Sequence, residues 1–436
     1  MIMKNLCDEK CIVVSSKSLF ARQDPAFSVF NFSFSVYNKY MRKILSFLIA
    51  LFISGSLFAE IITSEKFSYS VDFPEGYEIL DMEADETTVI FKNKYLAAHA
   101  LIRVWPDSKF KSSDEALKDT LGRLKARGDF SQALWRRQKC SISSFESPLL
   151  LPDENAKGWA ACIPLPQKKG YLSLLSYSPL KNYDDLAQVL ISVLDSVLID
   201  TGSFREPGLI TTAFYPRKSS KSINLTIDGK KITTTVDSID KEASQFVIDR
   251  EFAVFSFYAA NNLPEMFDAW VRFYRLLARD SMERVKKASF DIYTALHDDC
   301  EQKDKANPDA AFAQTLLYWA QGFNYERKSS SYDKADIESI PAILEGGSSD
   351  CDGRSLLLMC ILKNCSIDSC MFVSAQYSHA LLGVYFPDKQ GQTIKVDDGD
   401  AGKEYLVGET IDKNLTLGII RANMTDRSNW LSVELP

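Results

Sequence analysis

From Phe67 onward, apolar and polar residues alternate over several short segments, which is typical of half-buried β-strands. The run "FSYSVDF" begins this pattern, the turn "PEGYE" follows, and "TTVIFKN" and "AAHALIRVW" continue it. The segment "SSDEALKDTLGRLKARG" instead has apolar residues at helical spacing behind a Ser and Asp start. A closing helix, "NYDDLAQVLISVLDSVLI", ends near Ile199. The pattern predicts an α+β domain over residues 60–200: an antiparallel sheet with a helix or two on one face.

A second pattern of helices and strands follows a segment of different composition. Residues 201–250 are rich in Pro, Ser and Thr and contain short alternating runs around the turn signal "DGKK", which predicts a β-rich hairpin linker. A long helical stretch comes next, and then the helix "AAFAQTLLYWAQGFNYE", the apolar helix "RSLLLMCILKN" and the strands "SCMFVSA" and "HALLGVYF". We therefore expect a second α+β domain over residues 251–436, with helices packed on an antiparallel sheet.

Length and charge restrict the kinds of partner. The chain has 436 residues, of which 46% are hydrophobic, enough for two or three ordinary cores. The formal net charge is -7, and no sustained run of Lys and Arg is present, which argues against nucleic acid as a partner. We expect a protein or peptide-like substrate; the sequence does not indicate an oligomeric state.

Residues 41–59, "MRKILSFLIALFISGSLFA", have the layout of a secretory signal peptide: basic residues, an apolar run and small residues. The apolar run is shorter than the roughly 20 residues of a membrane span, so a retained anchor is the weaker interpretation. We interpret Met41 as the true start and residues 1–40 as a non-native or disordered extension. The mature protein would begin near Glu60 and be exported to the periplasm or the extracellular space. Association with the cell envelope is compatible with this location.

The cysteine count fits an exported protein. Without Cys7 and Cys11, seven cysteines remain, a number that allows one free thiol and six disulfide partners in unknown connectivity. The seven are Cys140, Cys162, Cys300, Cys351, Cys360, Cys365 and Cys370. No CxxC pair is present and the chain has three histidines, so we expect no metal site and no cofactor.

The stretch "GGSSDCDGRS" places Cys351 between two aspartates directly before an apolar helix. Ser349 is the expected N-cap, with Asp352 completing a capping box. The positive end of the helix dipole and the unpaired N–H groups of the first turn would then lower the thiol pKa and could hold an oxyanion. A position between two aspartates at the start of a helix is unusual for a structural cysteine and is suited to a nucleophile. Asp350 and Asp352 are assigned to capping, because either would raise the thiol pKa if it pointed at the sulfur.

His379 opens a predicted strand and is the only histidine between residues 311 and 424, so it is the candidate base for Cys351. His99 lies in an alternating strand and is interpreted as structural. His297 ends a helix beside acidic residues, and we assign it no role.

These segments resemble the transglutaminase-like superfamily, whose papain-related fold packs a nucleophile-bearing helix on an antiparallel sheet. The resemblance rests on "GGSSDCDGRSLLL" and "SHALLGVYF", which place Cys351 and His379 28 positions apart, and it covers residues 250–425. It implies a third catalytic residue: Glu409 in "YLVGET", or, as the alternative, Asp398 in "TIKVDDG". It also implies that Gln321 in "WAQGFNYE" helps to hold the oxyanion.

The first domain resembles the PsbP-like α/β fold over residues 65–200. The resemblance rests on the opening "FSYSVDFPEGY" and the closing "GYLSLLSYSPLKNYDDLAQVLISVLDSV". It implies a binding or scaffolding role.

The sequence thus leads to one hypothesis and one alternative. The hypothesis is an exported transglutaminase-like cysteine enzyme that performs acyl transfer or hydrolysis on an amide or peptide bond. The alternative is a non-catalytic binding or scaffold protein of the cell envelope that uses the same fold.

Overall fold

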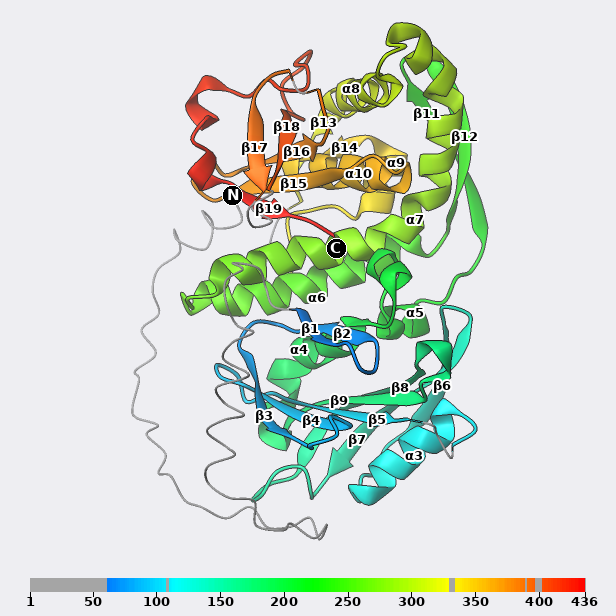
Figure 1. Cartoon of the computed structure of the whole chain (residues 1–436), viewed down its shortest axis with the longest axis vertical. Helices are drawn as coiled ribbons and strands as arrows, with labels where there is room; N and C mark the ends of the chain where they lie inside the picture. Colours follow the sequence, from blue (N-terminus) through cyan, green and yellow to red (C-terminus); the bar gives the residue numbers. More distant parts are fainter. Residues whose placement is uncertain (1–60, 107–109, 329–333, 389, 397–401, 436) are drawn as a thin grey trace. The chain divides into compact units, whose positions relative to one another are not determined.

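The structure is a computed structural model, and it describes residues 61–106, 110–328, 334–388, 390–396 and 402–435 (Figure 1). The predicted signal peptide and residues 1–40 lie outside these ranges. Within them, no helix is both long enough and apolar enough to cross a membrane. Helices and antiparallel sheets make up the described part, which confirms the α+β class.

A seven-stranded antiparallel sheet forms the first region, in the strand order β3-β4-β5-β9-β8-β7-β6. Its strands are β3 (Tyr77–Met82), β4 (Thr88–Asn93), β5 (His99–Trp105), β6 (Phe130–Trp135), β7 (Gln138–Ser147), β8 (Ala156–Pro164) and β9 (Tyr171–Pro179). A smaller sheet pairs β2 (Tyr69–Asp72) with β1 (Ile61–Ser64) on one side and β10 (Val197–Leu198) on the other.

The helices α3 (Ser113–Arg123) and α4 (Tyr183–Asp195) cover opposite faces of the large sheet. Neighbouring residues of β5 show this, because Leu101 belongs to the cluster around α3 and Ile102 to the cluster around α4. The expectation that the helices share one face was wrong. Both faces of the sheet are apolar at alternating positions, so each needs a cover.

The segment predicted as a linker contains a hairpin, β11 (Ser220–Ile227) paired with β12 (Lys230–Asp237). Asp228 and Gly229 both have positive φ, as a two-residue hairpin turn of this type requires. Residues 201–250 also hold more helix than expected: the 3-10 helix η3 (Thr201–Arg205), the short α5 (Leu209–Phe214) and the first part of α6 (Asp240–Ala260).

The remaining chain combines helices with a five-stranded sheet in the order β17-β18-β16-β15-β19. The helices are α7 (Met266–Lys303), α8 (Pro308–Gln321), α9 (Ile340–Gly346) and α10 (Cys351–Asn364). The strands are β15 (Ser369–Ser374), β16 (His379–Val384), β17 (Thr393–Val396), β18 (Lys403–Gly408) and β19 (Leu431–Val433). A short parallel pair, β13 (Asn324–Tyr325) and β14 (Ser348–Ser349), precedes α10.

The helix α7 has 38 residues, a length of about 57 Å, and packs beside α6 (Figure 1). One buried hydrophobic cluster runs from Val71 in β2 through Phe273 in α7 to Leu357 in α10. The proposed boundaries at residues 200 and 250 stay a prediction, but the apolar core does not stop at either of them.

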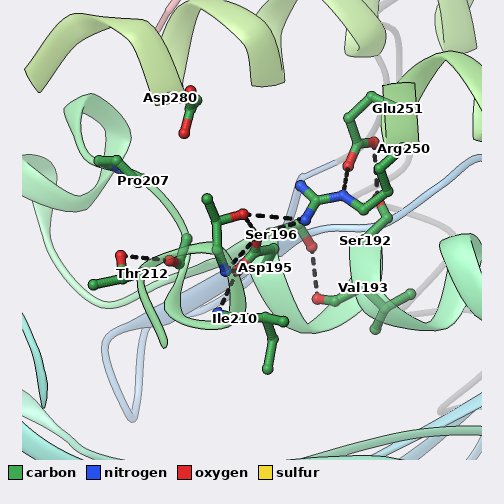
Figure 2. A network of polar contacts seen from close by, with 12 residues as sticks. Ser192, Val193, Asp195, Ser196, Pro207, Ile210, Thr212, Arg250, Glu251 and Asp280 are labelled. Atoms are coloured by element: carbon green, nitrogen blue, oxygen red, sulfur yellow. Dashed lines mark hydrogen bonds and ion pairs between the residues drawn. The ribbon is translucent and has the colours of Figure 1, made fainter. Parts of the chain in front are cut away.

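Buried ion pairs join α7 and α6 to the first region. Figure 2 shows Arg250 of α6 between two carboxylates: its Nη1 lies 2.6 Å from Asp195 Oδ2 and its Nε 2.6 Å from Glu251 Oε1. Arg272 of α7 donates to Glu251 Oε2 at 2.9 Å and to the backbone oxygen of Asp72 at 2.8 and 3.0 Å. None of these side chains is more than 4% exposed.

The same stripe of α7 carries two further arginines. Arg275 makes a bidentate pair with Asp72 of β2, at 2.8 Å for both bonds. Arg279 donates to three backbone oxygens, of Asp195, Val197 and Ser203, at 2.7 to 3.0 Å. These contacts satisfy charged groups that burial would otherwise penalise strongly. We call the side chains of Asp72, Asp195, Arg250, Glu251, Arg272, Arg275 and Arg279 the arginine network.

We expect Arg272→Met to lower the free energy of unfolding by about 3–5 kcal/mol, because it leaves Glu251 buried without one of its two cationic partners. Urea unfolding monitored by circular dichroism measures this. The matched control is Lys286→Met on the same helix, which removes an exposed pair with Glu283 and should cost less than about 1 kcal/mol. Equal losses in the two variants would contradict the role given to the network.

A second prediction concerns Glu75, which is buried beside this network and whose Oε1 makes no hydrogen bond in the described part. Burial raises the pKa of Glu75 to about 8, against a usual value of about 4.3 in an unfolded chain. Its contribution to stability is therefore fully present below pH 4 and is lost as the pH rises through 8.

Glu75→Gln should gain stability relative to wild type as the pH rises from 4 to 9, by an amount on the order of a few kcal/mol. Unfolding curves at four pH values test this. The exposed Glu78→Gln in β3 serves as the control. A difference between Glu75→Gln and wild type that does not change with pH would contradict the prediction.

Candidate active site

Cys351 is the first residue of α10, and the cap that holds it differs from the one expected. Asp350 is the N-cap, since its Oδ1 accepts a hydrogen bond from the backbone N–H of Gly353 at 3.1 Å. The expected Ser349 cap was therefore wrong by one residue. The third helical position is then Gly353, which has no side chain to complete a capping box. Cys351 does lie in the first turn, where backbone N–H groups lack helical partners.

Arg354 fixes the segments around this helix start. The buried guanidinium donates to the backbone oxygens of Ser349, Phe323 and Thr410, at 3.2, 2.9 and 3.0 Å. One side chain thus ties the segment before Cys351 to the residue that precedes β13 and to the loop after β18. Residues 356–362 of α10 are apolar and buried, and the helix packs against α7 and the five-stranded sheet, which holds the start of the helix in place.

His379 and Glu409 form a hydrogen-bonded pair. The imidazole Nε2 lies 2.8 Å from Glu409 Oε2 and 3.1 Å from Oε1. The pairing follows from the sheet, because β16 begins with His379 and its antiparallel neighbour β18 ends one residue before Glu409. Nδ1 makes no hydrogen bond to any described residue, so it is the nitrogen available for proton transfer.

Glu409 is fully buried and holds its charge through its partners. Burial alone would raise its pKa, but the hydrogen bond and charge of His379, together with the N–H of Ile411 at 2.9 Å, lower the pKa below its usual value. Glu409 therefore stays ionised at neutral pH. It can orient the imidazole and stabilise its protonated form.

The thiol of Cys351 lies in a different electrostatic environment from the one expected. Burial raises its pKa well above the ordinary value, and the nearby carboxylates of Asp352 and Asp350 raise it further. The backbone N–H of Ala380, the residue after His379, lowers it by a smaller amount. The expected net lowering by the helix N-terminus was wrong, because desolvation and two carboxylates outweigh the partial charge of the helix.

Asp352 has a direct role at the sulfur. The thiol donates to Asp352 Oδ1 at 3.3 Å, and Tyr274 of α7 donates to Asp352 Oδ2 at 2.7 Å. The assignment of Asp352 to capping was therefore wrong. At rest, the thiol is protonated and its proton points at a carboxylate.

Asp350 and Asp336 complete an acidic group around Arg327. Arg327 lies 3.6 Å from a carboxylate oxygen of each. Burial and the charge of Asp352 raise the pKa of Asp350 to about 8, and the pKa of Asp336 is also raised. Asp350 is therefore largely protonated at neutral pH, which limits the negative charge beside the sulfur.

Gln321 does not occupy the position of an oxyanion donor. Its Nε2 donates to the backbone oxygens of Glu409 and Leu415, at 2.8 and 2.9 Å. Both amide protons are used, so the predicted oxyanion role is wrong for this conformation. Gln321 instead fixes the backbone at Glu409 and thereby positions the partner of His379.

The other sequence-based candidates lie elsewhere. Asp398 falls outside the described residues. The seven cysteines of the described part are all free thiols, so the disulfides that the cysteine count allows are not formed among them. Six of them are buried, and Cys365 is partly exposed.

The two remaining histidines lie on other elements and are not part of the candidate site. His99 stacks on Tyr177, and burial lowers its pKa to about 4, which fits the structural role expected. His297, Asp298 and Glu301 lie close enough together to share a metal ion, but they are on the surface at the end of α7.

The sequence did not point to five groups of the site, which contact the start of α10, its two aspartates or Glu409: Tyr274, Arg327, Asp336, Arg354 and Arg421. Arg354 lies within the motif "GGSSDCDGRS", directly before the apolar run of the helix. A charged residue at this position could have been predicted to belong to the site. The others come from distant segments and have no common pattern. Cys351 and His379 are 2% and 8% exposed, so the site is closed in this structure.

Comparisons with known proteins give a likeness of fold over part of the chain. No family model matches, and no curated protein matches. A cyanobacterial PsbP from Synechocystis sp. PCC 6803 is similar over 34% of this chain and 96% of its own, with 14% identity and a TM-score of 0.27.

The Ran-binding protein Mog1p of Saccharomyces cerevisiae is similar over 34% of this chain and 98% of its own, with 14% identity and a TM-score of 0.25. A Mog1 E65A mutant covers 32% of this chain and 95% of its own at 14% identity, with a TM-score of 0.24. The similar structures thus include PsbP-like and Mog1 folds for about a third of the chain. They give no evidence for the transglutaminase-like resemblance, and we infer no activity from them.

We expect Asp352→Asn to increase the rate at which iodoacetamide alkylates Cys351 at pH 8 by about threefold to tenfold. The variant removes a charge that raises the thiol pKa, so a larger fraction of Cys351 is thiolate. Mass spectrometry of the Cys351 peptide over time measures the rate. Glu326→Gln, which removes an exposed carboxylate near β13, is the control and should leave the rate unchanged. An unchanged rate in Asp352→Asn would contradict the electrostatic role of Asp352.

Proposed function

We propose that Cys351, His379 and Glu409 carry out acyl transfer or hydrolysis on an amide or peptide bond, with a transglutaminase-like arrangement of the second half of the chain. The observation that carries the proposal is the His379–Glu409 pair at 2.8 Å. Cys351 lies in the first turn of a buried helix. Supporting it, the Cys351 sulfur lies next to the backbone N–H of the residue that follows His379.

In the proposed reaction, His379 Nδ1 takes the thiol proton and the sulfur attacks the amide carbonyl carbon. The C–N bond breaks, the amine leaves with the proton from the imidazolium, and a thioester remains on Cys351. Water or a second amine then attacks the thioester, giving a carboxylic acid or a new amide and restoring the thiol. The reaction needs no oxidant or reductant.

Glu409 fixes the tautomer in this scheme. Its carboxylate accepts from Nε2–H, which leaves the lone pair on Nδ1 for the thiol proton. The oxyanion would be held by backbone N–H groups of the first turn of α10, at Cys351 itself, because Gln321 is used elsewhere.

Because the resting thiol is buried and its proton is directed at Asp352, the substrate must change the environment of the thiol. A closed site with a protonated thiol is inactive until the proton moves from the Asp352 side to the imidazole. Binding of an acyl group that displaces water and opens a path to Cys351 would supply that change.

The same observations favour one competing function. A thiol that is 2% exposed, and whose pKa is raised by burial and by the neighbouring Asp352 and Asp350, is also what a non-catalytic scaffold would show. In that case the His379–Glu409 pair would be a structural ion pair. Export to the periplasm or extracellular space is part of both proposals, as is a binding role for the PsbP-like region.

Turnover decides between the two functions. We expect the protein from residue 60 onward, incubated with a casein digest and hydroxylamine, to convert amides into free acids and hydroxamates detected by mass spectrometry. Cys351→Ala should form no product. Glu409→Gln should reduce kcat by about 10² to 10⁴, because the imidazole loses its orienting charge.

The matched control is Glu404→Gln, a carboxylate on the strand that leads to Glu409. It should retain activity. Equal product in wild type and Cys351→Ala would overturn the proposal, and so would the absence of both product and acyl-Cys351 in the wild type.

A further inference from the structure

Arg421 lies at the rim of the cysteine site. Its Nε is 3.9 Å from Glu409 Oε2, the oxygen that His379 Nε2 contacts. Its side chain is 38% exposed, whereas Cys351, His379 and Glu409 are almost completely buried. A ligand that approaches His379 and Glu409 from solvent can therefore meet Arg421 before it reaches them.

Asp412 holds the guanidinium of Arg421 in one orientation. Nε and Nη2 donate to the two oxygens of Asp412, each at 2.6 Å. Arginine has five N–H donors, so three remain after these two bonds. No other described residue accepts from them. The side chain is thus fixed in a planar geometry with free donors, which lowers the entropy cost of binding a further acceptor.

The other arginines around the thiol do not have free donors of this kind. Arg354 is buried and uses its donors on three backbone oxygens. Arg327 lies between the carboxylates of Asp336 and Asp350. Of these three arginines, Arg421 is the one whose position and exposure suit a ligand.

We propose that Arg421 binds a carboxylate of the substrate, next to the carbonyl that Cys351 attacks. The substrate class is then an amide or peptide with a free carboxylate close to the reacting bond, such as an acidic residue or a chain end. Guanidinium and carboxylate form paired, charge-assisted hydrogen bonds, which give both affinity and orientation. This inference rests on the proposed function, because it takes Cys351 as the reacting group.

Three alkylating reagents of similar size and different charge test the proposal without a known substrate. They are iodoacetate (negative), iodoacetamide (neutral) and 2-bromoethylamine (positive), each applied to the protein from residue 60 onward with peptide mapping of Cys351. The rates are divided by those of a small free thiol, which removes the intrinsic reactivity of each reagent.

We expect iodoacetate to react with saturation at high concentration and faster than iodoacetamide after this correction. Arg421→Gln should lower the ratio of iodoacetate to iodoacetamide rates by about tenfold, which corresponds to one charge-assisted interaction. Arg421→Lys should retain part of the ratio, since it keeps the charge but not the planar fork. Lys413→Gln, an exposed cation in the same loop as Asp412, is the matched control and should leave the ratio unchanged.

Asp412→Asn provides a second readout in case Arg421→Gln fails to fold. Removing the carboxylate that competes for the guanidinium should increase the iodoacetate rate and leave the iodoacetamide rate unchanged.

The outcomes separate this inference from the proposed function. If Cys351 reacts with all three reagents and Arg421→Gln does not alter their ratio, or if 2-bromoethylamine is preferred, the carboxylate site is overturned and the reactive thiol stands. If Cys351 reacts only after unfolding in urea, no accessible nucleophile exists and both proposals fall.

Discussion

The burial of the arginine network against backbone and side-chain acceptors of β2, α4, η3 and α6 is the constraint on which the rest of the structure depends. A guanidinium removed from water is costly unless its donors are satisfied, so each arginine fixes the positions of its partners. Arg275 fixes β2 through Asp72, and Arg279 fixes the chain that leaves α4. The network specifies where the first region meets α7.

A neighbouring stripe of α7 supports the candidate site. Tyr274, Ala278 and Met282 follow one another at helical spacing, about 100° around the axis from Arg275 and Arg279. Tyr274 donates to Asp352, the backbone oxygen of Ala278 lies 3.8 Å from the thiol of Cys360, and the backbone oxygen of Met282 accepts from Asn364. A single rigid helix therefore positions the first region on one side and the cysteine helix on another.

The sequence allowed the pattern of strands, the helix behind Cys351 and the pair of His379 with a later glutamate to be predicted. These predictions worked because each rests on local periodicity or on a motif whose residues share one sheet. Glu409 is the clearest case, since the antiparallel register places Gly408 opposite Leu382, so that β18 ends while it runs toward the His379 end of β16. The oxyanion role predicted for Gln321 was wrong, because its amide N–H groups donate to the backbone oxygens of Glu409 and Leu415. Only the folded loop brings these oxygens near Gln321.

Local sequence patterns did not predict the burial of the arginines of α7 or the raised pKa of the Cys351 thiol. Arg272, Arg275 and Arg279 look like the solvated stripe of an amphipathic helix, and only the tertiary positions of Asp72 and of the Asp195 backbone oxygen show them to be buried. The net effect on the Cys351 thiol was misjudged for a related reason. The helix N-terminus acts over its first turn with a partial charge, whereas burial removes the thiol from water and the carboxylate of Asp352 acts beside the sulfur with a full charge.

The acidic environment of the thiol has a consequence for how such a site would work. An enzyme with a permanently ionised thiol attacks any electrophile that reaches it, whereas a thiol bonded to Asp352 reacts only when its proton is redirected to His379. The cost of that redirection must be met by interactions that form with the correct substrate. A fixed cation at the rim is well placed to provide one, because a carboxylate bound there would also position the neighbouring carbonyl. In the proposed mechanism, the closed, protonated resting state prevents unselective reaction, and the cation at the rim selects the substrate that can redirect the proton.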